Sequence, residues 1–164
     1  MTGGRTAWED EIEATWRRLG TEEPAAFLAR MERTVARPGV PEGVRLFEIA
    51  GAHDALDQPD LAVRGYRAAL DSGLDDHRAR QATIQLASSL RNLGEPREGL
   101  RLLETLGTGH GDGLDDAIVV FRALMLADLG REREALAATM HALAEHLPRY
   151  GISAHAYADA LIRD

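Results

Sequence analysis

The sequence predicts an all-α protein built from helix hairpins that repeat along the chain. Three observations lead to this prediction: a composition that favours helix, apolar side chains spaced for amphipathic helices, and a segment that recurs after 37 and then 36 residues. Alanine, leucine, glutamate and arginine are abundant, whereas the β-branched residues valine and isoleucine are scarce, which favours helix over strand. A chain of 164 residues is long enough to bury a sizeable core.

The recurring segment reads as a tight turn followed by the start of a second helix. It occupies residues 55–62, 92–99 and 128–135, and each copy ends on a small residue, namely Ala62, Gly99 or Ala135. Glycine at the end of a first helix tolerates a positive φ angle, and proline in the first turn of a second helix loses no hydrogen bond. We expect the small residues to let the two helices approach closely, with Ala62 facing Ala50.

These hairpins resemble tetratricopeptide repeats. The resemblance is carried by residues 47–54, 66–70 and 85–94, and it extends over residues 42–148. In particular, these residues resemble a compact bacterial tetratricopeptide family of unassigned biochemical role. The resemblance implies a right-handed helical solenoid whose concave groove binds peptides or partner proteins.

The predicted domain organisation follows from the repeats. They occupy residues 41–148, at about 42–74, 80–111 and 115–148, and are flanked by N-terminal helices in 1–40 and a C-terminal capping helix in 149–164. Solenoids need such flanking segments, because a terminal repeat otherwise exposes half of its core. Trp8, Ile12 and Trp16 share one face of the first helix, and we expect them to pack on the repeats or to form a homodimer contact.

The composition argues against several kinds of site and partner. The chain has no cysteine, which excludes disulfides, cysteine-ligated zinc and thiol catalysis, and no lysine, which excludes Schiff-base chemistry. A formal net charge of −8 argues against a nucleic-acid partner and against an anionic membrane surface. Since no apolar run reaches the length of a signal peptide or a membrane span, we expect a cytoplasmic location.

No catalytic residue, metal site or cofactor is predicted. His141 and His146 lie on one predicted helix, but they point about 140° apart around its axis, so they do not form a zinc site. The glycine-rich residues 107–113 follow a helix and lack the Lys-Ser/Thr ending of a phosphate loop, which favours a connector between repeats. We therefore expect a protein that is not an enzyme.

The second repeat carries a row of polar side chains that points to binding. Its members recur at helical spacing opposite an apolar stripe, with an arginine alongside. Side-chain amides suit the backbone of an extended peptide, and arginine suits a carboxylate. With flanking residues of the first and third repeats, the predicted ligand-binding set is Phe47, Asp54, Gln81, Gln85, Ser88, Arg91, Asn92 and Phe121.

The expected partner is a protein or peptide whose identity the sequence does not give. Two alternatives stay open. The polar row is equally compatible with a helix face that only contacts water. The protein is also compatible with a self-associating scaffold whose groove is filled by its own terminal helix or by a second copy.

Overall fold

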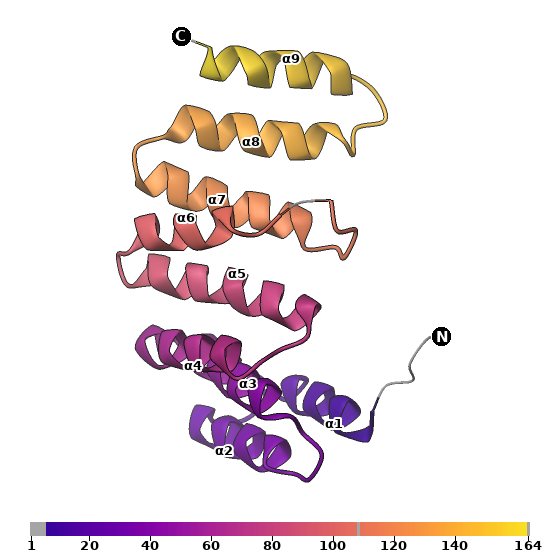
Figure 1. Cartoon of the computed structure of the whole chain (residues 1–164), viewed down its shortest axis with the longest axis vertical. Helices are drawn as coiled ribbons and strands as arrows, with labels where there is room; N and C mark the ends of the chain where they lie inside the picture. The colour runs from indigo at the N-terminus through magenta and orange to yellow at the C-terminus, as the bar shows by residue number, and fades with distance from the viewer. Residues whose placement is uncertain (1–5, 108, 164) are drawn as a thin grey trace. The chain divides into compact units, whose positions relative to one another are not determined.

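The computed structural model describes residues 6–107 and 109–163, and α-helix is the only regular secondary structure in them (Figure 1). The predicted all-α helical-repeat fold is therefore confirmed. In chain order the helices are α1 (Ala7–Trp16), α2 (Pro24–Val35), α3 (Glu42–Ala55), α4 (Pro59–Asp71), α5 (Asp76–Asn92), α6 (Pro96–Glu104), α7 (Asp115–Asp128), α8 (Glu132–Ala144) and α9 (Gly151–Ile162).

The chain folds as two compact units, residues 1–89 and 90–164, with the boundary inside α5. The helix pairs α3–α4 and α7–α8 lie within the predicted repeats 42–74 and 115–148, whereas α5 begins at Asp76, ahead of the predicted start of the second repeat at residue 80. The exact limits of the repeats stay a prediction. Among the described residues no helix combines the length and the apolar character that crossing a membrane requires.

The first unit is organised around a core that α1, α2 and α3 share. This core contains Ile12, Phe27, Met31, Val35, Val40, Val44 and Ala52. The two tryptophans of α1 pack against it, and the ring of Trp16 lies 5.6 Å from that of Phe27, centroid to centroid. The apolar face of α1 therefore has a partner within its own chain.

The α3–α4 hairpin brings its two helices together at small residues. Ala50 and Ala62 are both completely buried, as small residues at a helix contact should be. One turn further along α4, Gly65 lies directly against Ala50. The helices α3 and α4 are therefore in contact at Ala50, and Gly65 takes part in this contact. The facing of Ala62 and Ala50 themselves stays a prediction.

In the second unit each helix packs on the next, α6 on α7, α7 on α8 and α8 on α9. Leu103, Ile118 and Met125 are completely buried in its interior. Gly94 and Gly130 both have positive φ angles, 81° and 74°, at the turns where the sequence places the end of a first helix. These glycines end α5 and α7 and allow the chain to turn back sharply.

Candidate binding site

The predicted polar row lies on the accessible side of α5. Between residues 80 and 90, every position is buried except Gln81, Gln85 and Ser88. These three residues are spaced i, i+4 and i+7, so they form one stripe along the helix. The rest of this stretch of α5 is enclosed by protein, and the stripe is the part of it that another molecule could touch.

Gln85 has an unsatisfied acceptor in the middle of this stripe. Its side-chain oxygen Oε1 is buried and has no hydrogen-bond partner among the described residues. A buried amide oxygen without a donor typically costs about 1–3 kcal/mol of stability. If the Gln85 side chain turns towards the surface of the stripe, an N–H group from a bound peptide would remove that cost.

Asp54, a predicted binding residue on α3, accepts hydrogen bonds from two hydroxyl groups. Ser89 Oγ lies 2.9 Å from Asp54 Oδ1, and the hydroxyl of Tyr66 lies 3.4 Å from Oδ2. Burial raises the pKa of the Asp54 carboxyl, and the hydrogen bonds from Ser89 and Tyr66 oppose the shift. Asp54 therefore joins α3, α4 and α5 through polar contacts.

Phe47, the other predicted residue on α3, lies in the interior. Its exposed fraction is 9%, and its ring lies 6.1 Å from the ring of Tyr66, centroid to centroid. Its contacts are thus with the neighbouring helix α4. In this arrangement Phe47 packs against Tyr66 and offers little surface to a ligand.

The remaining predicted residues belong to the second unit. Arg91 forms a two-point ion pair with Asp128 at the end of α7, with Nε–Oδ2 and Nη2–Oδ1 distances of 2.5 and 3.0 Å. This contact raises the pKa of the Arg91 guanidinium. Asn92 is exposed, and Phe121 is half-buried on α7. Arg91 therefore already holds a carboxylate, which a ligand would have to displace or share.

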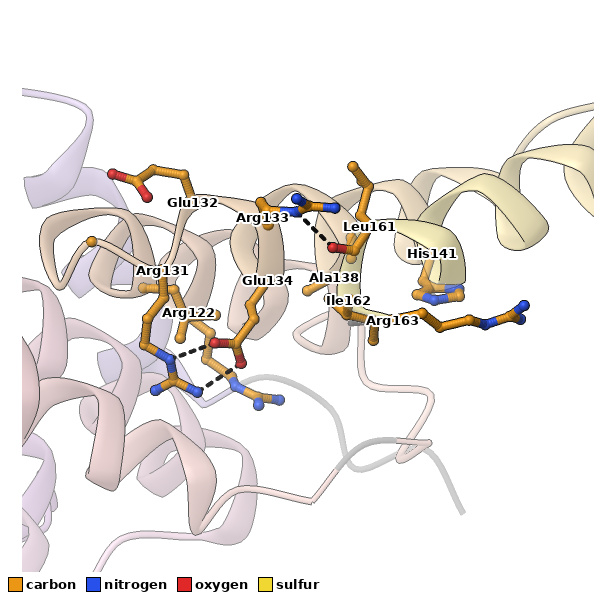
Figure 2. A pocket seen from close by; sticks show the side chains of 13 residues that line it. Arg122, Arg131, Glu132, Arg133, Glu134, Ala138, His141, Leu161, Ile162 and Arg163 are labelled. Atoms are coloured by element: carbon orange, nitrogen blue, oxygen red, sulfur yellow. Dashed lines mark hydrogen bonds and ion pairs between the residues drawn. The ribbon is translucent and has the colours of Figure 1, made fainter.

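Sequence reasoning missed a large cavity between α7, α8 and α9, with a volume of about 960 Å³. Figure 2 shows that Arg131 and Glu134 face one another across one end, joined at 2.8 and 2.7 Å. Arg133 donates to the backbone oxygen of Leu161 at 2.8 Å. The Nε of Arg122 is buried and has no partner among the described residues. The sequence feature that could have pointed to this cavity is the alternation of arginine and glutamate over residues 131–134.

Two histidines from α8 and α9 face one another near this cavity. The Nδ1 atoms of His141 and His155 are 2.7 Å apart, and their Nε2 atoms approach Asp159 and Glu145 at 3.2 and 3.0 Å. His146 instead lies 2.9 Å from Asp116. Among the described residues no group of three or more potential ligands could hold a metal ion. The histidine pair is a contact between α8 and α9.

A smaller cavity of about 270 Å³ lies between α1, α3 and the start of α5 in the first unit. It is lined by both tryptophans of the chain and by four charged side chains. The sequence indicated the tryptophan face of α1 but gave no sign that a buried glutamate of α3 would meet it. That contact depends on how α1 packs on α3.

Comparison with known proteins gives one match. A family model described as "Tetratrico peptide repeat" matches residues 43–161, which is most of the chain. No curated protein and no solved structure matches it.

Proposed function

The chain belongs to the tetratricopeptide repeat family, and on that basis we propose that it binds a partner protein or peptide along the polar stripe of α5. Repeats of this family generally mediate protein–protein interactions and are generally not enzymes. The finer proposal is that the ligand is an extended segment lying in the groove that the first helices line. A cytoplasmic location and a bacterial source stay predictions from the sequence.

The unsatisfied oxygen of Gln85 is the observation that supports this proposal most directly. Gln81 and Ser88 lie one turn to either side of it and can donate and accept hydrogen bonds. An extended peptide presents alternating N–H and C=O groups, which match such a row.

Selection of peptides from a random library on the wild-type protein tests the proposal. The selected peptides should bind at least ten-fold more weakly to the double variant Gln81→Ala with Gln85→Ala. Glu32→Ala on α2, an exposed substitution in the same unit, serves as the control and should bind as the wild type does. Peptides that bind the double variant and the wild type equally would exclude the α5 stripe as the binding site.

Self-association is a second candidate, and the surface of α9 favours it. Ile152 and Tyr157 on this helix are 89% and 70% exposed, although large apolar side chains are usually shielded when they recur on one helix. A second copy of the chain could cover them. Sedimentation equilibrium of the wild type and of Ile152→Ser with Tyr157→Ser distinguishes the cases, since only a self-associating protein would lose mass in the double variant.

A further inference from the structure

The smaller cavity of the first unit combines aromatic rings with carboxylates. Its lining residues are Trp8, Glu9, Ile12, Glu13, Trp16, Glu48 and Arg78. Its volume of about 270 Å³ lies just below the range of about 300–1,000 Å³ typical of pockets for small molecules. The cavity is thus of a size for a single side chain.

Most of the charges around this cavity already have partners. Arg78 pairs with Glu9 at 2.8 Å and with Asp75 at 2.7 Å, and its guanidinium carbon lies 5.5 Å from the centre of the Trp8 ring. Glu13 pairs with Arg17 at 2.7 Å. One guanidinium of the chain is therefore held here by a tryptophan face and two carboxylates.

Glu48 is the exception. Its exposed fraction is 8%, and its one hydrogen-bond partner among the described residues is the indole Nε1–H of Trp16, 2.6 Å from Oε2. Burial raises the pKa of this carboxyl, while the hydrogen bond from Trp16 and, next, the charge of Arg78 act in the opposite direction. An uncharged indole does not neutralise a buried carboxylate, and Glu48 forms no ion pair among the described residues, since the nearby Arg78 pairs with Glu9 and Asp75.

We propose that this cavity binds the guanidinium group of an arginine side chain from a partner protein. The Glu48 carboxylate supplies the opposite charge, and Trp8 and Trp16, which line the cavity, supply aromatic rings of the kind that attract planar cations. Ile12 offers an apolar surface to the methylene stem. The site shares no residue with the α5 stripe, so the two sites can be tested separately.

Tryptophan fluorescence gives a direct measurement, because Trp8 and Trp16 are the two tryptophans of the chain. We would titrate the full-length protein with N-acetylarginine amide and, in parallel, with N-acetylcitrulline amide, an uncharged side chain of nearly the same shape. Saturable binding of the arginine compound, at least ten-fold tighter than that of the citrulline compound, is expected. Equal responses to both, or no response to either, would overturn the proposal.

Glu48→Gln separates binding from folding. Glutamine keeps an acceptor for the indole of Trp16 but removes the charge, so affinity for N-acetylarginine amide should fall at least ten-fold. The melting temperature at pH 7 should stay the same or rise, because the variant no longer buries an ionised group. Glu32→Gln on α2 should change neither quantity. Undiminished binding of N-acetylarginine amide by Glu48→Gln would contradict the proposal. If that variant fails to fold, the comparison of the arginine and citrulline compounds on the wild-type protein still tests the proposal.

Discussion

Gly65 of α4 lies so close to Ala50 of α3 that a Cβ atom built on the glycine would stand 2.7 Å from the Cβ of Ala50. Real Cβ atoms essentially never approach so closely, and the backbone of Ala50 lies only 3.2 Å away. Gly65 sits in the middle of a helix, where glycine is otherwise unfavourable. The residue is therefore explained by helix contact, and the α3–α4 spacing depends on it.

Gly65→Ala should destabilise the protein by about 1–3 kcal/mol, the usual cost of adding a methyl group to a well-packed contact. The gain in helix propensity, about 1 kcal/mol, offsets part of the strain. Urea denaturation measures the free energy of unfolding. Arg64→Ala, at the exposed preceding position, should change it by less than about 0.5 kcal/mol. A stable Gly65→Ala variant would mean that α3 and α4 are farther apart.

Two adjacent serines of α5 should respond differently to the same substitution. Ser89 is completely buried and its hydroxyl contacts Asp54, so Ser89→Ala should cost about 1–3 kcal/mol by leaving the half-buried carboxylate of Asp54 with one donor fewer. Ser88 lies on the accessible stripe, so Ser88→Ala should stay within about 0.5 kcal/mol of wild type. Thermal and urea unfolding compare them. Equal losses would mean that α5 is rotated about its axis.

The Arg91–Asp128 pair should show a measurable but small coupling energy. A double-mutant cycle with Arg91→Ala and Asp128→Ala should give about 0.2–1 kcal/mol at low salt, because the pair is partly exposed to water. The coupling should shrink as salt is added. Asn92→Ala, which removes an exposed neighbour, is the control and should couple to neither residue. A coupling of zero at low salt would show that the ion pair does not form in solution.

Glu9 should make the protein sensitive to acid. The backbone N–H of Thr6, and next the side chain of Arg78, lower the pKa of Glu9 from 4.5 to about 2. A carboxyl with a lowered pKa stabilises the fold at pH values above its unfolded pKa, and this stability is lost as the pH falls towards the folded value. Melting temperatures of wild type and Glu9→Gln should therefore differ at pH 7 and converge between pH 4.5 and 2.

Glu23→Gln provides the comparison for this experiment, since Glu23 is exposed at the start of α2 and caps no helix through its side chain. Its melting temperature should follow that of the wild type over the same pH range. If Glu9→Gln also follows the wild type at every pH, the contacts of Glu9 with Thr6 and Arg78 contribute nothing to stability.

Local signals in the sequence were sufficient to predict the helices and the turns between them. Gly94 and Gly130 mark helix ends because a positive φ angle suits glycine, and Pro59 and Pro96 mark helix starts because the first turn needs no N–H donor from them. The stripe of α5 was also predictable. Its periodicity places Gln81, Gln85 and Ser88 on one side of the helix whatever the helix packs against.

Contacts between helices are a different matter, because they depend on where two helix surfaces cross. The sequence pointed to Ala62 as a small residue facing Ala50, but it gave no sign that Gly65 of α4 would lie directly against Ala50 as well. Phe47 is an aromatic residue of the kind found in binding sites. Only the packing shows that its ring is buried against Tyr66. Helix periodicity in the sequence shows which side chains share a helix face. It does not show which neighbouring helix packs on that face, or where.

The sequence by itself determined an all-α chain of helix hairpins with a polar stripe on α5, because helix periodicity, caps and turns act over a few residues. Only the tertiary structure decided that Arg91 meets Asp128, 37 positions away, and that Trp16 meets Glu48, 32 positions away. Whether such a carboxylate is paired, buried or open to a ligand depends on the dielectric surroundings and partners that packing supplies. Those are properties of the folded chain, and no local pattern of residues encodes them.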